Sequence, residues 1–315
     1  MYAIVRRLLF LGERETFSAP DTTGPFVIVD IHTHPWNSHL QREKPILSRT
    51  TAKDVRRFVD LSDRLVQKMD RLGIDVSVVL ASIDLPDELL HKIVQKYPDR
   101  LVGFTYGYPS LDPETTHKEL EALDRAVKDL GFKGIKLIPL FQGLPFDSPA
   151  LRPILEKACE LRVPIMLDCW PITDLGPVTA DPRFQGLAAY DTITSDYQNL
   201  FRFTSSTLMD RLPNLNIIAA HAGGGALLFP DVIGRKKMEQ IYFDTAAIRS
   251  THGLKRIEMG VNMIGAEKIL FGSDDWIENC PCTQEIMLEA IRRLDLNQEQ
   301  EAAILGQNAQ RLLGL

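Results

Sequence analysis

FVIVDIHTH, at residues 26–34, decides the fold, because it is a continuous apolar run that ends in two histidines. Unbroken apolar runs of this length are typical of parallel strands that are buried on both faces. Seven further runs follow along the chain: VSVVLAS (76–82), LVGFTYG (101–107), GIKLIP (134–139), VPIMLDC (163–169), LNIIAAH (215–221), IYFDTA (241–246) and KILFGSD (268–274). Amphipathic helical patterns lie between them or after the last one, at 52–73, 87–97, 116–131, 149–162 and 283–294. This alternation predicts an α/β protein with the architecture of a (β/α)8 TIM barrel.

The same patterns bear on the number of domains. One barrel over residues 26–315 accounts for most of the chain, which leaves residues 1–25 as an N-terminal extension. We expect this extension to be an added strand or helix at the bottom of the barrel. A doubly wound open sheet is the alternative fold. Such a sheet usually carries a glycine-rich turn after its first strand, where this chain has HTHPW.

Composition excludes several classes of protein. The chain of 315 residues has 36 Lys and Arg against 42 Asp and Glu, which gives a net charge of −6. This balance argues against a general nucleic-acid binder and against a protein that binds anionic membranes. The four cysteines do not make a disulfide scaffold, and no apolar run is long enough to span a bilayer. We therefore expect a cytoplasmic protein that acts on a small molecule.

Ionisable residues stand at the ends of several predicted strands, which is where a barrel of this kind places its active site. His32 and His34 are two residues apart on the first strand, so both imidazoles share one face and suit a divalent metal such as zinc. Asp274 ends the eighth run, where a buried carboxylate needs a metal or a histidine as its partner. The alternatives are two structural histidines and an aspartate that caps the following helix.

His221 and Lys136 are further candidates for a site at the same end of the barrel, and Asp168 is a candidate partner of Lys136. His221 ends the sixth run just before AGGG, and its ordinary pKa suits acid–base catalysis, although a structural histidine is the alternative. Lys136 lies on the fourth strand, where it would meet either Asp168 or a substrate carboxylate. A carboxylated lysine that bridges two metals is a further alternative. Cys169 is expected to point away from the barrel interior by alternation, so it is not a candidate ligand.

The motifs DIHTH, KGIKLIP, HAGGG and LFGSDDW together resemble the amidohydrolase-related superfamily. The stretch NIIAAHAGGGALLFPDVIGR is similar to the strand-six segment of the branch that contains aminocarboxymuconate semialdehyde decarboxylase and related metal-dependent hydrolases. The resemblance covers residues 26–315. It implies one metal ion, usually zinc, held by the HxH pair, a histidine on strand five and an aspartate on strand eight. It also implies that the strand-six histidine and that aspartate handle protons.

His32, His34, His221 and Asp274 match this pattern, whereas Asp168 stands where the family has its strand-five histidine. A carboxylate can bind zinc, so the expected ligands are His32, His34, Asp168 and Asp274. Such a ligand set would also favour harder ions such as manganese. The alternative is a chain that binds metal poorly or not at all.

Aromatic residues surround the predicted site. Trp36, Trp170 and Trp276 follow the ends of strands one, five and eight, and with Lys136 they are the candidate substrate-binding residues. Ordinary loop packing is the alternative for the three tryptophans. The long segment 171–200 is expected to cover the pocket or to contact a second subunit, so a homodimer is one expected assembly.

These residues predict a metal-dependent hydrolase. Asp274 or His221 would take a proton from metal-bound water, which would attack an amide, lactone or ester of a small organic substrate. Non-oxidative decarboxylation of an unsaturated or aromatic acid is an alternative that uses the same residues. A metal-free barrel that acts as a lactonase or as a binding protein is a third hypothesis, motivated by Asp168 in place of histidine.

Overall fold

The computed structural model describes residues 26–34, 52–81, 85–139, 144–169, 198–246, 251–276 and 283–315. The predicted N-terminal extension, residues 1–25, lies outside the described residues. Most of the segment predicted to cover the pocket lies outside them as well.

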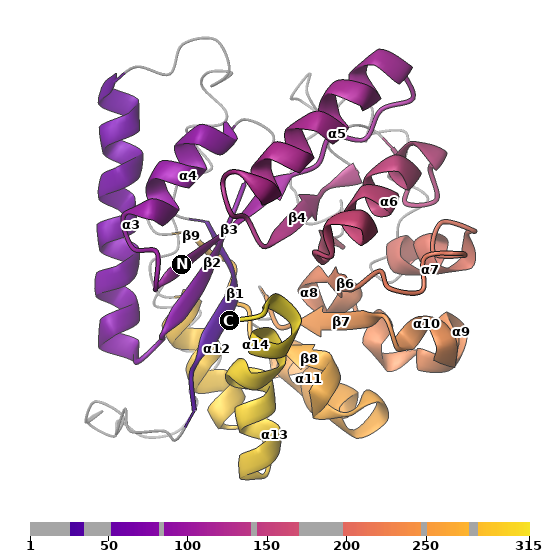
Figure 1. Ribbon diagram of the computed structural model, residues 1–315. Helices are drawn as coiled ribbons and strands as arrows, with labels where there is room; N and C mark the ends of the chain where they lie inside the picture. Colours follow the sequence, from indigo (N-terminus) through magenta and orange to yellow (C-terminus); the bar gives the residue numbers. More distant parts are fainter. Residues whose placement is uncertain are drawn as a thin grey trace, which may run out of the picture.

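Parallel strands make up the centre of the described structure (Figure 1). Their order in the sheet is β8-β7-β6-β5-β4-β3-β2-β1-β9, and every neighbouring pair is parallel. Their bounds are β1 Val29–His34, β2 Val76–Leu80, β3 Leu101–Tyr106, β4 Gly134–Leu137, β5 Ile165–Leu167, β6 Ile217–Ala219, β7 Ile241–Asp244, β8 Ile269–Leu270 and β9 Asp275–Trp276.

The barrel closes where the end of the eighth strand run meets β1. The backbone N–H of Ile31 donates to the carbonyl of Phe271 at 2.9 Å, and that of Asp274 donates to the carbonyl of His32 at 2.9 Å. Residues Asp275 and Trp276 then form β9, which continues the pairing with β1. These contacts join β1 to both β2 and the eighth strand run, as a TIM barrel requires.

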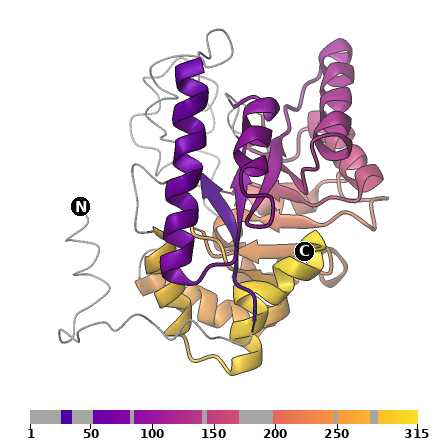
Figure 2. The ribbon, with the colours of Figure 1, turned by 60° about the vertical axis from the view of Figure 1, so that its left-hand side comes forward.

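Helices surround the strands in both views (Figures 1 and 2). Helices α3, α4, α5 and α6 lie between consecutive strands from β1 to β5 and serve as crossover elements. The helix bounds are α3 Ala52–Leu72, α4 Asp87–Gln95, α5 Pro113–Lys128, α6 Arg152–Leu161, α7 Gln198–Ser205, α8 Ala220–Gly223, α9 Pro230–Ile233, α10 Arg235–Met238, α11 Thr251–Ile264, α12 Thr283–Arg292, α13 Gln298–Ala302 and α14 Asn308–Leu313.

Two buried apolar clusters hold the molecule together. The larger one lies between strands and helices, and includes Leu65 of α3 and Ile135 of β4. The smaller one fills the inside of the barrel with residues such as Ile31, Phe104 and Met166. Ala309 and Leu313 of α14 belong to this inner cluster, so the last helix of the chain packs against the barrel interior.

The predicted (β/α)8 barrel is therefore confirmed, and the open doubly wound sheet is excluded by the closing contacts. The observed strands fall within or directly beside the eight predicted runs, and α3 coincides with the pattern at 52–73 to within one residue. None of the described helices is both long enough and apolar enough to cross a membrane.

Candidate metal centre and active site

An irregularity in β1 turns both histidines of the HxH motif toward the barrel mouth. The register of β1 against β2 shifts between Asp30 and Thr33. Before the shift, Val29 points into the inner apolar cluster, whereas after it His32 and His34 face the carboxylate of the eighth strand run. A bulge of this kind re-aims the side chains that follow it, because an extra residue reverses their alternation.

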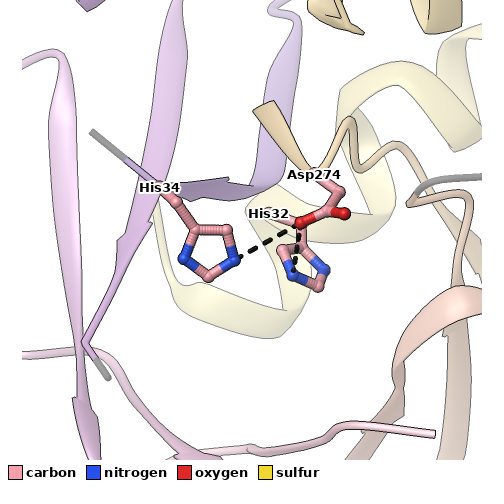
Figure 3. A group of neighbouring side chains, drawn as sticks. All are labelled: His32, His34 and Asp274. Atoms are coloured by element: carbon pink, nitrogen blue, oxygen red, sulfur yellow. Dashed lines mark ion pairs between the residues drawn. The ribbon is translucent and has the colours of Figure 1, made fainter. Parts of the chain in front are cut away.

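His32, His34 and Asp274 come together as the sequence predicts. Oδ1 of Asp274 lies 3.4 Å from Nε2 of His34 and 3.7 Å from Nε2 of His32, so one oxygen faces both rings (Figure 3). One possible ligand atom of each residue lies within 4.8 Å of the others, and all three residues are buried. Two imidazoles and a carboxylate at this spacing can hold a divalent metal ion.

Asp244, at the end of β7, orients the first of these ligands. Its Oδ2 lies 2.8 Å from Nδ1 of His32, which donates a hydrogen bond to it. Burial lowers the pKa of His32 well below its ordinary value, so the ring is neutral and its Nε2 lone pair faces Asp274. Two acceptors that face each other fit a cation between them, and a carboxylate behind a histidine is the usual support for a metal ligand.

Asp274 is held in place by its backbone and by the histidines. Its φ of 53° is in the left-handed region, and its N–H donates to the carbonyl of His32 at 2.9 Å. Burial by itself would raise the pKa of Asp274, but the hydrogen bond with His34 and the neighbouring rings hold it well below its ordinary range. The carboxylate is therefore ionised, as a metal ligand must be.

His221 stands beside the metal-binding group, with its ring centroid 5.2 Å from that of His32. It begins a run of left-handed residues, 221–225, which ends in three glycines and turns the chain sharply after β6. Its backbone N–H donates to Oδ1 of Asp244 at 2.6 Å, and its Nδ1 lies 3.3 Å from the carbonyl of Ala246. Its other ring nitrogen, Nε2, lies 3.5 Å from Oδ1 of Asp168.

These contacts favour a protonated His221. Burial alone would lower its pKa, but the carboxylate of Asp168 more than offsets this effect and raises the pKa above its ordinary value. Both ring nitrogens then face acceptors, an arrangement that suits an imidazolium with two N–H groups.

Lys136 and Asp168 form an ion pair in which Lys136 is fully buried and Asp168 is partly buried. Lys136, on β4, has no exposed surface, and its Nζ lies 2.9 Å from Oδ2 of Asp168. Burial by itself would raise the pKa of Asp168, but Lys136 and His221 hold it well below its ordinary range. Among the described residues, the group that could hold a metal is His32, His34 and Asp274, without Asp168. The roles predicted for Asp168 as a ligand and for Lys136 as a substrate contact remain predictions.

Several other predicted residues lie outside what the structure describes. Trp36 and Trp170 are among them. Trp276 lies on β9, where its backbone pairs with that of His34, and its side chain is not described. Cys169 lies in the outer apolar cluster, which confirms that it points away from the barrel interior.

Two residues that hold the site in place, Asp244 and Asp30, were not predicted from the sequence. Asp244 lies within the seventh run and is the last residue of β7, so it follows the same rule that selected Asp274. Asp30 lies within the motif DIHTH, and its carboxylate accepts from the backbone N–H groups of His32 and Ser273 at 3.1 and 3.0 Å. The position of Asp244 at the end of β7 was a usable signal, whereas Asp30 is the second residue of β1 and has no such position.

Comparisons with known proteins agree with this geometry. An amidohydrolase family model matches residues 29–315. The 2-amino-3-carboxymuconate-6-semialdehyde decarboxylase of Dictyostelium discoideum is 23% identical over 292 residues, covering 80% of this chain and 76% of that protein. The gamma-resorcylate decarboxylase of Polaromonas sp. (strain JS666) is 27% identical over 286 residues, covering 71% of this chain and 82% of that protein.

A solved structure shares the fold. It is a dihydroxybenzoic acid decarboxylase from Polaromonas sp. JS666 with bound manganese and the inhibitor 2-nitroresorcinol. Its TM-score is 0.63 at 21% identity, with 92% of this chain and 97% of that chain covered.

These relatives correct the expected reaction. The sequence motifs predicted a hydrolase that uses zinc, but the relatives are decarboxylases and the solved structure holds manganese. The hydrolase prediction is therefore wrong, and zinc is not supported. The error has a physical reason, because His32, His34, His221 and Asp274 can serve both reactions and their spacing does not distinguish them.

Proposed function

Since this chain belongs to the amidohydrolase family, we propose that it is a metal-dependent, non-oxidative decarboxylase of a small aromatic or unsaturated carboxylic acid. The observation that carries the proposal is the position of His221, whose ring centroid lies 5.2 Å from that of the metal-binding His32 and whose Nε2 lies 3.5 Å from Oδ1 of Asp168, a carboxylate that raises the pKa of His221. The decarboxylases among the relatives support the same reaction.

The metal site would consist of His32, His34 and Asp274. A divalent metal bound there supplies positive charge that polarises substrate oxygens. Manganese is the ion that we propose first, because the related structure holds it. Lys136 adds a buried positive charge whose field reaches His32 and Asp244. With a divalent metal bound, its charge together with those of Lys136 and His221 would exceed the charge of the Asp168, Asp244 and Asp274 carboxylates, which favours an anionic substrate over a neutral one.

His221 would supply the proton that the reaction needs. In decarboxylation the bond between the carboxyl carbon and its neighbour breaks, and the electron pair stays on that neighbour as CO2 leaves. A proton must then replace CO2 on that carbon, and a positioned imidazolium is a suitable general acid. Ala246 and Asp168 fix the direction of the His221 ring, and solvent returns the proton after each cycle.

The buried surroundings serve this step in a second way. His32, His34 and His221 are each less than a tenth exposed, and Asp274 has 8% exposure. Electrostatic interactions are stronger where water is scarce, so fixed charges at this site act with little screening.

The test is to incubate the purified protein with Mn²⁺ and a panel of acids, including 2,6-dihydroxybenzoate, other hydroxybenzoates and unsaturated dicarboxylic acids. We expect CO2 release from at least one acid, loss of activity with a chelator, and recovery when Mn²⁺ returns. In D2O the product should carry deuterium at the carbon that lost CO2.

The matched variants are His221→Asn and His117→Asn, the second of which replaces an exposed histidine on α5. Loss of the general acid should lower kcat by about 100-fold or more, while the control keeps its activity. A protein that hydrolyses lactones or amides and releases no CO2 from any acid of the panel would contradict the proposal.

A further inference from the structure

Asp168 is the residue on which this chain departs from its expected pattern, and its contacts assign it a different task. We propose that Asp168 is a positioning residue that Lys136 keeps out of the metal site, so that the metal has three protein ligands, His32, His34 and Asp274. This inference rests on the metal site of the proposed function.

The first observation is that Lys136 requires a counter-ion. Its side chain has no exposed surface, and an ammonium group without a partner is very costly to bury. Oδ2 of Asp168 lies 2.9 Å from its Nζ. If the Asp168 carboxylate turned to a metal ion, this buried positive charge would lose the carboxylate on which it depends.

The second observation is that the other oxygen of Asp168 is also engaged. Oδ1 faces Nε2 of His221 at 3.5 Å. The backbone N–H of Asp168 donates to the carbonyl of Leu137 at 2.9 Å, which ties the end of β5 to β4. Asp168 thus lies between a lysine from β4 and a histidine from β6, with one carboxylate oxygen directed at each.

The third observation is that the metal-binding group is complete without Asp168. A single oxygen of Asp274 faces both His32 and His34, and the ligand atoms of these three residues lie within 4.8 Å of one another (Figure 3). A site with three protein ligands keeps coordination positions open for substrate, as catalytic metal sites do. Asp168 instead acts through His221, whose ring it holds in one orientation.

The experiment measures Mn²⁺ affinity by competition with a chelator, and coordination by electron paramagnetic resonance. Asp168→Asn keeps the size of the side chain and removes its charge. We expect its Kd for Mn²⁺ to rise by no more than about tenfold, because the unpaired charge of Lys136 opposes the cation, whereas Asp274→Asn, which removes a ligand, should raise Kd by about 100-fold or more. Asp70→Asn, at an exposed ion pair with Arg100, is the surface control.

Lys136 provides the converse test. Lys136→Met should free the Asp168 carboxylate to reach the metal, which would tighten Mn²⁺ binding and change the resonance spectrum. Because Asp168→Asn leaves the buried Lys136 without its counter-ion and could fail to fold, the double variant Lys136→Met/Asp168→Asn removes both charges together. Its Kd for Mn²⁺ should lie within about threefold of wild type, because no metal ligand is lost and the net charge of the site is unchanged.

Activity separates a positioning role from a purely structural one. At saturating Mn²⁺, Asp168→Asn should lower kcat by about tenfold or more, because His221 loses its orienting partner. An unchanged kcat, or a rise in Kd as large as that of Asp274→Asn, would overturn the inference.

A wild-type protein that binds no divalent metal would overturn the proposed function and this inference together. A metal-dependent decarboxylase in which Asp168 proves to be a ligand would overturn the inference alone.

Discussion

Asp244 connects two histidines of the site, because each of its carboxylate oxygens has a separate task. Oδ2 accepts from Nδ1 of His32, and Oδ1 accepts from the backbone N–H groups of His221 and Ala246. The residue therefore fixes both which nitrogen of His32 carries the proton and where the chain turns after β6.

We predict that Asp244→Asn weakens metal binding without unfolding the protein. The asparagine oxygen can still accept the two backbone N–H groups, which leaves its NH2 group facing Nδ1 of His32. That contact requires Nδ1 to be an acceptor, so the ring proton moves to Nε2, the nitrogen that a metal would bind. The Kd for Mn²⁺ should rise by about 10- to 100-fold, measured by chelator competition. Asp210→Asn, at an exposed ion pair with Lys237, should leave Kd unchanged. Equal Kd values for the two variants would contradict this role.

The residues of the site differ in how well the sequence predicts them. His32 and His34 are close in the chain, and Asp274 ends an apolar run, so local patterns identify all three. Asp244 lies 212 residues from His32, and no local pattern reports their hydrogen bond. The pairing of Lys136 with Asp168 was one of two alternatives from the sequence, because either a carboxylate of the chain or one of the substrate could neutralise the lysine.

At the scale of the elements, Asp30 joins β1 to the eighth strand run. Its Oδ1 accepts from the backbone of both segments, and its Oδ2 accepts from Oγ of Ser273 at 2.6 Å and from Nε2 of Gln284 at 2.9 Å. This carboxylate lies at the seam where the barrel closes. It therefore holds the strands that carry His32 and Asp274 next to each other.

We predict that Ser273→Ala destabilises the seam. The variant removes the Oγ donor to a buried carboxyl group and leaves the backbone contact in place. The free energy of unfolding should fall by about 1–3 kcal/mol, measured with urea. Ser206→Ala, which removes hydrogen bonds with neutral groups only, the carbonyl of Phe203 and the N–H of Leu208, should cost less. An equal or smaller loss for Ser273→Ala would show that the contact with Asp30 contributes little.

The elements themselves follow closely from the sequence, whereas their irregularities do not. Apolar runs predict the strands because both faces of a parallel sheet are buried. The register shift in β1 cannot be predicted in this way, since FVIVDIHTH has the same apolar pattern with or without an extra residue opposite β2. The packing of α14 against the barrel interior was also unforeseen, because its apolar spacing fits any buried helix.

At the scale of the whole molecule, the fold and the site leave the reaction open. A barrel with two histidines, an aspartate and a general acid serves hydrolysis and decarboxylation equally, so the relatives had to correct the prediction. Hydrolysis adds metal-activated water to the substrate, whereas decarboxylation replaces CO2 on carbon by a proton, and the same residues can serve either step.

The stability of the whole molecule should also depend on two acidic residues that are not part of the metal site. Asp87 of α4 and Glu119 of α5 line one pocket with Thr105 of β3. Burial raises the pKa of Asp87 to about 6 and that of Glu119 to about 7. The hydrogen bonds from Thr105 to Asp87, and from the N–H of Tyr108 to Glu119, lower these values only in part.

We predict that the free energy of unfolding falls as the pH rises from about 4 to about 7. In this window the folded state keeps protons on Asp87 and Glu119 that the unfolded state has released, so each step up in pH favours the unfolded state. The loss should be on the order of 2 kcal/mol per group once partial solvent exposure is allowed for.

In the double variant Asp87→Asn/Glu119→Gln this part of the pH dependence should disappear, and stability at pH 8 should rise relative to wild type. Urea unfolding at pH 5 and pH 8 measures both quantities. Glu121→Gln, which changes an exposed residue on the same helix, is the control. If the double variant and the control show the same difference between the two pH values, these two carboxyl groups are not its source.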